Sequence, residues 1–139
     1  MQAKKKTEPS RRENIRKHIG HIGLSSLSVF AKYPNFAQRA ELVDLSVNGM
    51  LIHVTRDNLS KTLKNNFNLD DLEGRFITLN IDPMELEMDA LIVRTKRIDK
   101  NTFELALDYS EGVPEYWREC LFDLIPGEFH HHLDGDEFL

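Results

Sequence analysis

The stretch AELVDLSVNGMLIHV, residues 40–54, decides the fold class of this 139-residue chain. Apolar and polar residues alternate before Asn48-Gly49, and Met50 and Ile52 continue the same period of two after it. An Asn-Gly pair between two such runs favours a β-hairpin, because both residues accept the positive φ angles of a type I′ turn. The sequence therefore predicts two antiparallel strands joined by this pair.

The same alternation marks further strand-length runs on both sides of the hairpin. Their bounds are residues 27–33, 77–81, 86–98 and 103–109. Alternation of this kind is typical of strands with one buried face. Five or six antiparallel strands with short connections predict a small closed or nearly closed barrel.

Two segments break this rhythm. Leu59, Leu63 and Phe67 recur every four residues, which predicts a short helix or ordered loop across one end of the barrel. Residues 113–125 carry apolar side chains at helical spacing and predict a helix that packs on the barrel. Trp117 belongs to the apolar stripe of this helix and is expected in the core.

Composition indicates one soluble globular domain. Hydrophobic residues make up 40% of the chain and charged residues 29%. No apolar run approaches the ~18 residues of a membrane span, and the first residues lack the apolar core of a secretory signal. We therefore expect a cytoplasmic protein without membrane insertion. The single Cys120 cannot form an internal disulfide and is expected to be buried.

Positive charge is concentrated at the N-terminus. Residues 1–17 hold seven Lys or Arg and two Glu, a net charge of +5, so the remaining residues carry −10. An acidic body would repel a nucleic acid duplex, whereas a compact anion needs only a few well-placed cations. We expect a flexible basic arm at 1–23, a barrel with its closing helix at 24–126, and a disordered tail at 127–139.

Two polar clusters carry the functional signal. The first is the arginine group Arg11, Arg12 and Arg16, whose planar guanidinium groups match a phosphate or the O6/N7 edge of guanine. Alone, such a group also fits a solvated tail. The second cluster begins 28 residues after Arg16 and has the form D-x-S-x-x-G. Its carboxylate and hydroxyl can bind guanine N–H groups, although the cluster alone also fits a simple turn.

The two clusters together resemble the PilZ domain family. They give the pattern R-x-x-x-R followed by D-x-S-x-x-G, and the likeness extends over about residues 11–126 through the strand pattern and the closing helix. PilZ domains are receptors for the bacterial second messenger cyclic di-GMP. The resemblance implies a mainly β fold, a six-stranded antiparallel barrel with a C-terminal α-helix, preceded by the arginine arm.

The resemblance also implies a role for each motif residue. Arg12 and Arg16 would bind the phosphates and the Hoogsteen edges of the guanines. Asp44 and Ser46 would hydrogen-bond a guanine, and Gly49 would set the turn. The arm would close on the barrel when the ligand binds and signal to a downstream protein partner, in motility or biofilm regulation.

An arginine directly ahead of R-x-x-x-R has a further implication. In the family, this residue tends to accompany binding of a stacked, intercalated cyclic di-GMP dimer. Arg11 occupies that position and would be an extra ligand contact. The resemblance thus implies binding of two ligand molecules.

No enzyme signature is present in the sequence. It has no Gly-rich phosphate loop, no nucleophile elbow and no zinc-protease helix motif, so we expect no catalytic residue. Three consecutive histidines at 130–132 lack the spacing of a structural zinc site, so no metal or other cofactor is expected. Two other functions stay open: a PilZ-like adaptor that binds a protein without nucleotide, and a small barrel that binds single-stranded nucleic acid through its basic arm.

Overall fold

A computed structural model describes residues 15–64 and 68–129 of the chain. In these residues, strands alternate with short 3-10 turns, and a ten-residue helix follows the last long strand. In chain order the elements are β1 (Lys17–Val29), β2 (Tyr33–Leu45), β3 (Gly49–Thr55), η1 (Arg56–Asn58), η2 (Lys61–Leu63), η3 (Leu69–Leu72), β4 (Phe76–Ile81), η4 (Asp82–Met84), β5 (Leu86–Arg97), β6 (Thr102–Asp108), α3 (Glu115–Leu124) and β7 (Glu128–Phe129).

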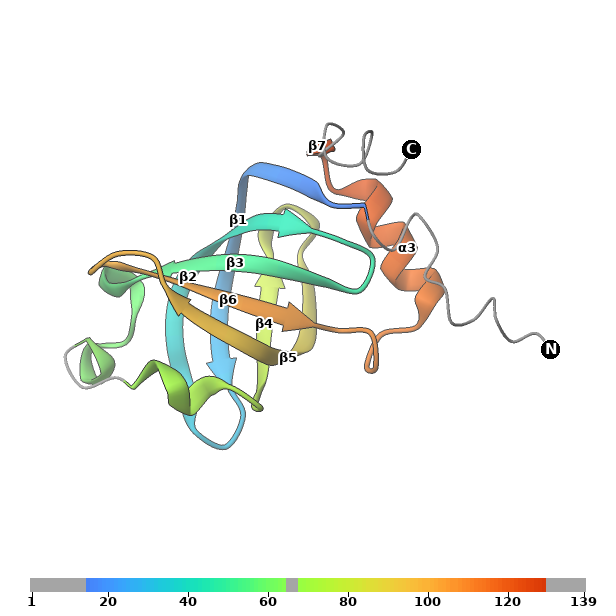
Figure 1. Ribbon diagram of the computed structural model, residues 1–139. Helices are drawn as coiled ribbons and strands as arrows, with labels where there is room; N and C mark the ends of the chain where they lie inside the picture. Colours follow the sequence, from blue (N-terminus) through green and yellow to red (C-terminus); the bar gives the residue numbers. More distant parts are fainter. Residues whose placement is uncertain (1–14, 65–67, 130–139) are drawn as a thin grey trace.

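The first six strands close into an antiparallel barrel. Their order in the sheet is β2-β3-β6-β5-β4-β1, and β1 also pairs with β2, which joins the two ends of the sheet. The short β7 adds to the beginning of β1, and α3 lies beside the barrel near this end (Figure 1). The predicted six-stranded barrel with a C-terminal helix is therefore confirmed.

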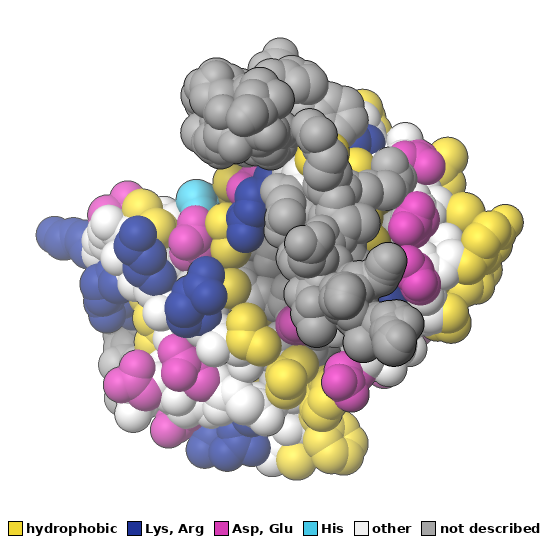
Figure 2. All heavy atoms as spheres, turned by 45° about the vertical axis from the view of Figure 1, so that its right-hand side comes forward, with side chains coloured by type: hydrophobic (Ala, Val, Ile, Leu, Met, Phe, Trp, Pro, Cys, Tyr) yellow, Lys and Arg dark blue, Asp and Glu magenta, His cyan; other side chains and the backbone are white. Residues whose placement is uncertain are grey.

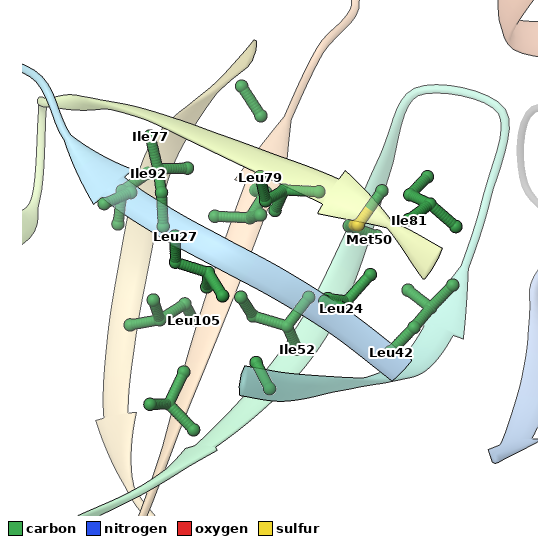
Figure 3. Close-up of a cluster of buried hydrophobic side chains, with 14 of the residues drawn as sticks. Leu24, Leu27, Leu42, Met50, Ile52, Ile77, Leu79, Ile81, Ile92 and Leu105 are labelled. Carbon is green, nitrogen blue, oxygen red and sulfur yellow. The ribbon is translucent and has the colours of Figure 1, made fainter. Parts of the chain in front are cut away.

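The barrel is filled by the apolar residues of the period-two runs. In β3, Met50, Ile52 and Val54 are buried, while the residues between them are partly exposed. Successive side chains of a strand point to opposite faces, so one face of every strand contributes to the same interior. Side chains from β1, β2, β3, β4, β5 and β6 meet there (Figure 3). Those labelled in the figure are Leu24, Leu27, Leu42, Met50, Ile52, Ile77, Leu79, Ile81, Ile92 and Leu105.

The expected single strand over residues 27–33 is wrong, because the chain reverses in the middle of this run. β1 ends at Val29 and β2 begins at Tyr33. Ala31 has φ 61°, a left-handed conformation that bends the chain back, and the Lys32 amide donates to the Val29 carbonyl over 3.1 Å. Period-two spacing alone cannot reveal such a turn, since the apolar rhythm continues through it.

The barrel begins and ends outside the expected domain boundaries. Residues 17–23 were expected in the arm, but they form the first part of β1 and pair with both β2 and β7. Ile19 in this part is only 2% exposed, so it anchors the strand in the core. At the other end, Glu128–Phe129 belongs to β7 rather than to a tail. The remainder of the expected tail, 130–139, lies outside the described residues.

The segment after β3 crosses the barrel end as an ordered loop with 3-10 turns. Leu59 and Leu63 belong to this loop and are buried, as their spacing predicted, whereas Phe67 lies outside the described residues. The helix predicted over 113–125 is present as α3, with Leu121 and Phe122 buried. Within the described part of the chain, no helix is long and apolar enough to cross a membrane.

Two side chains of α3 differ from expectation. Trp117 was expected in the core but is 56% exposed, and Cys120 is partly exposed rather than buried. The orientation of α3 about its own axis explains both. It directs Leu121 and Phe122 toward the barrel, so Trp117 lies at the margin of the contact. An apolar stripe in the sequence gives the face of a helix but not how much of that face its neighbour covers.

Candidate functional site

Strand pairing brings the two sequence motifs together. In the β1–β2 ladder, Lys17 is opposite Leu45 and His18 is opposite Asp44. Arg16 directly precedes this ladder, so its guanidinium reaches the end of β2, and Nη1 donates to the Asp44 carboxylate Oδ2 over 3.2 Å. The Arg16 side chain is half exposed, whereas the Asp44 side chain is largely buried. The long, half-exposed side chain of Arg16 therefore faces the carboxylate of Asp44, which is buried in the barrel wall.

These residues line one pocket with the rest of the D-x-S-x-x-G motif. Arg16, Asp44, Ser46 and Gly49 all border a hollow of about 170 Å³ on the barrel wall. The opposite side of this hollow is formed by β5 and β6. Of the predicted ligand-binding residues, Arg11 and Arg12 lie outside the described residues. The structure thus juxtaposes the four predicted residues that it describes.

Ser46 and Gly49 close the turn on which the motif lies. The Ser46 amide donates to the Gly49 carbonyl over 2.9 Å, and the Gly49 amide donates to Ser46 Oγ over 3.2 Å. The expected type I′ turn is wrong, because neither Asn48 nor Gly49 has a positive φ. Glycine is required here for another reason: a Cβ on Gly49 would lie 2.2 Å from the Leu107 carbonyl oxygen. The motif glycine lets β3 approach β6.

The buried Tyr109 side chain hydrogen-bonds the backbone of this turn. Its hydroxyl donates to the carbonyl oxygens of Ser46, over 2.8 Å, and of Gly49, over 3.2 Å. The ring is only 1% exposed, and this burial raises the pKa of the Tyr109 phenol well above its ordinary value. Tyr109 therefore stays protonated, and its hydroxyl remains a donor to the turn at neutral pH.

Arg118 connects the turn to α3. Its Nη1 donates to the Asn48 side-chain oxygen in a short hydrogen bond, and its Nε donates to the Val113 carbonyl over 2.9 Å. Asn48 also borders the pocket. The position of the pocket's rim is thus linked directly to the first half of the helix.

Sequence reasoning missed several residues of this site. Arg94 in β5 and Asp108 at the end of β6 border the pocket beside Asn48. An exposed arginine in a period-two strand is indistinguishable from a solvated surface residue. Only the β5–β6 register, with its irregularity between Ile92 and Arg94, places it opposite Asp44 across the hollow.

The described residues contain no cluster of three or more His, Cys, Asp or Glu side chains arranged to hold a metal ion. The three histidines at 130–132 lie outside the described residues. What the described site presents instead is guanidinium, carboxylate, hydroxyl and backbone groups. Such groups recognise a ligand by charge and hydrogen bonding.

Comparison with known proteins adds a likeness of fold. No model of a protein family matches the sequence, and no curated protein matches it. Among solved structures, the PilZ domain with c-di-GMP of YcgR from Escherichia coli is similar, with a TM-score of 0.50 and 17% sequence identity. The match covers 88% of this chain and 93% of that chain. The barrel, its closing helix and this likeness together show that the chain has the PilZ fold.

Proposed function

We propose that this protein is a receptor for cyclic di-GMP that binds the nucleotide between the N-terminal arginines and the D-x-S-x-x-G wall. The observation that carries the proposal is the single pocket bordered by Arg16, Asp44, Ser46 and Gly49. These residues come from two distant parts of the sequence and match the family motif in type and order. The structural neighbour from Escherichia coli, a PilZ domain with c-di-GMP, supports the same ligand.

The chemistry of the pocket suits a phosphorylated guanine. The Arg16 guanidinium offers paired donors to a phosphate or to guanine O6 and N7. The Asp44 carboxylate accepts hydrogen bonds from guanine N–H groups, and the Ser46 hydroxyl can donate or accept. The Arg16–Asp44 ion pair is no barrier, because a half-exposed pair contributes only about 0 to 1 kcal/mol. A ligand with two phosphates can replace it with stronger contacts.

The size of the pocket indicates a role for the residues before it. Its volume of about 170 Å³ is below the roughly 300 to 1,000 Å³ of typical ligand pockets. The barrel wall therefore accommodates part of the nucleotide, and we assign the remaining contacts to Arg11 and Arg12. Fixing such a segment costs about 1 to 2 kcal/mol per residue, so several charge-assisted bonds must act together.

The proposed signal is the closure of this arm on the barrel. Binding fixes Arg11 and Arg12 against the same turn that Arg16 reaches, and the newly ordered surface is read by a protein partner. Arg11 would also contact a second, intercalated nucleotide, which gives two ligand molecules per chain. The receptor acts by binding and shape change, without catalysis.

Isothermal titration calorimetry with cyclic di-GMP tests the proposal. We expect saturable heat with a stoichiometry of two, and a loss of roughly 1 to 3 kcal/mol of binding free energy in Arg12→Ala or Arg16→Ala. Arg39→Ala is the matched control, because Arg39 is exposed on β2 and does not border the pocket. Unchanged affinity in both motif variants would remove the arginines from the site.

The same titration separates the competing functions. A response to a single-stranded oligonucleotide and none to cyclic di-GMP would identify a nucleic-acid-binding barrel. No heat with either ligand would leave the adaptor that binds protein without nucleotide as the remaining function. A stoichiometry of one with normal affinity would retain the receptor but exclude the stacked dimer.

A further inference from the structure

We propose that the groove between α3 and the start of β5 is a docking site for a basic, amphipathic helical segment of a partner protein. The groove is separate from the nucleotide pocket: the two share no lining residue. The proposal therefore names a surface and a kind of partner that cyclic di-GMP binding does not itself define.

The groove has an apolar floor. It encloses about 550 Å³ and is bordered by Leu86 and Met88 of β5, by Val113, and by Trp117 and Leu121 of α3. This volume falls within the roughly 300 to 1,000 Å³ of pockets that bury a ligand of several large groups. Apolar side chains of a partner can therefore be buried here.

The apolar surface continues from the groove onto the outer face of α3. Trp117 is 56% exposed, Tyr116 is 75% exposed and Leu124 is 67% exposed. Most large apolar side chains in the described chain are buried, so three on one ten-residue helix form an exception. Contiguous apolar patches of this kind mark interaction sites more often than isolated exposed residues do.

Two acidic side chains border the groove, and α3 carries three more outside it. Glu87 and Asp89 border the groove on the β5 side. Glu115, Glu119 and Asp123 form a separate acidic stripe on α3, on the side of the helix away from Leu121. The one basic residue of α3, Arg118, directs its guanidinium to Asn48 and the Val113 carbonyl. Along the right-hand edge of Figure 2, hydrophobic side chains lie beside acidic ones, whereas basic side chains gather on the left.

The charge of this rim selects the partner. Opposite charges across an interface favour association, and like charges disfavour it. A second copy of this chain would bring acidic rims together, and an anionic membrane would be repelled in the same way. A helix with apolar residues at i, i+3, i+4 and i+7 and Lys or Arg between them satisfies both the floor and the rim.

Trp117 reports on this site directly, because it is the only tryptophan in the chain. The probe is a synthetic 16-residue helical peptide, about four turns long, with Leu and Phe on one face and Lys on the other. Its matched twin carries Glu in place of every Lys. We expect the Lys peptide to shift the Trp117 emission to the blue in a saturable manner and the Glu peptide to bind at least tenfold more weakly. The titration is run with and without cyclic di-GMP.

Charge-reversal variants keep the tryptophan and test the rim. Glu87→Lys and Asp89→Lys should each weaken binding of the Lys peptide about tenfold and relieve the rejection of the Glu peptide, a change of roughly 1.4 kcal/mol. Glu41→Lys is the matched control, because Glu41 is exposed on β2 away from the groove. By calorimetry, Trp117→Ala should also lose binding, while Phe30→Ala, which removes another exposed aromatic, should not.

Several results would overturn the proposal. The first is no change in Trp117 emission with the Lys peptide in either titration. The second is equal affinity for the Lys and Glu peptides. The third is a loss of Lys-peptide affinity in Glu41→Lys as large as in the groove variants. A concentration-dependent emission shift with dimer formation in sedimentation would assign the groove to a second copy instead. A shift with zwitterionic vesicles but not with peptide would assign it to a membrane. None of these outcomes depends on whether cyclic di-GMP binds.

Discussion

Gly49 occupies a position of the site that has no room for a larger side chain. A Cβ at this position would lie 2.2 Å from the Leu107 carbonyl oxygen, and the obstacle is backbone that cannot rotate away. We therefore expect Gly49→Ala to push β3 from β6 and to lower the free energy of unfolding by about 1 to 3 kcal/mol or more. Urea denaturation followed by circular dichroism measures the change.

Gly20→Ala provides the control for this substitution. Gly20 also lies in a strand, but a Cβ there would meet nothing within 4 Å. Alanine at position 20 should leave the midpoint unchanged or raise it slightly, because it restricts the unfolded chain. Equal destabilisation by both substitutions would mean that the approach of Gly49 to Leu107 is not what requires glycine.

Tyr109 makes stability depend on alkaline pH. Burial raises the pKa of its phenol in the folded state, whereas the unfolded phenol titrates near its ordinary value of 10.0. Below pH 10 both states are protonated and the stabilisation by Tyr109 is complete. Above pH 10 the unfolded state releases its proton first, so the free energy of unfolding falls as pH rises.

Tyr109→Phe should remove this dependence. At about pH 8 the variant should be less stable by roughly 1 to 3 kcal/mol, because the Ser46 carbonyl loses its donor. Its deficit relative to the natural chain should shrink between about pH 10 and 11, as measured by urea midpoints. Tyr116→Phe is the control, since Tyr116 is 75% exposed, and should show no such change. A deficit that is constant with pH would contradict the role of the buried phenol.

At the scale of elements, the strands could be predicted because their chemistry is local. Apolar and polar residues alternate in residues 40–54 and 103–109 because each strand has one face toward solvent and one buried face. The structure has β2, β3 and β6 there. The missed reversal at Ala31 has no such signal, because its left-handed backbone is carried by an ordinary residue. Family resemblance supplied the closure of the barrel, which pairing of β1 with β2 now displays.

The site was predictable only where residue type and spacing repeat a motif. Asp44, Ser46 and Gly49 belong to one turn, so their proximity follows from the sequence. Arg94 of β5 borders the same pocket, and Tyr109, directly after β6, hydrogen-bonds the turn, so both contributions depend on register and packing. No local pattern distinguishes them from a surface arginine and a core tyrosine.

Lys17 holds the end of α3, and the sequence likewise shows no sign of this role. The sequence places it at the end of a basic arm, yet it is 6% exposed. Its Nζ donates to the Phe122 carbonyl in a short bond and to the Ile125 carbonyl over 2.8 Å, and it lies 4.7 Å from the centre of the Phe122 ring. A cation at the C-terminal end of a helix is favoured by the unpaired carbonyls there. Lys17 therefore fixes the end of α3 to the start of β1.

At the scale of the molecule, α3 is linked to two residues of the proposed nucleotide pocket, to Arg16 through its neighbour Lys17 and to Asn48 through Arg118. Lys17, next to Arg16, binds the carbonyls at its C-terminal end, and Arg118 in its first half binds Asn48 on the pocket rim. The groove proposed for a partner helix lies on the same α3. A ligand that moves either pocket wall must therefore act on the helix that presents Trp117.

This arrangement predicts coupling between cyclic di-GMP and the Lys peptide. Because Lys17 and Arg118 link α3 to residues beside and on the rim of the pocket, saturating nucleotide should act on the groove through the helix and tighten peptide binding about fivefold or more. The saturating peptide must then tighten nucleotide binding by the same factor, because coupling free energies are reciprocal, and values of about 1 to 3 kcal/mol are typical. Trp117 emission and calorimetry measure the two directions independently.

Arg118→Met tests the path of this coupling. The variant should bind each ligand alone, since Arg118 borders neither the pocket nor the groove, but its coupling factor should fall toward one. Arg56→Met is matched to it, because Arg56 also donates to backbone carbonyls, those of Lys64 and Lys100, on loops away from α3. A coupling factor that survives in Arg118→Met would show that the Asn48 link is not required. A factor of one in the natural chain would mean that the two sites are independent, whatever each of them binds.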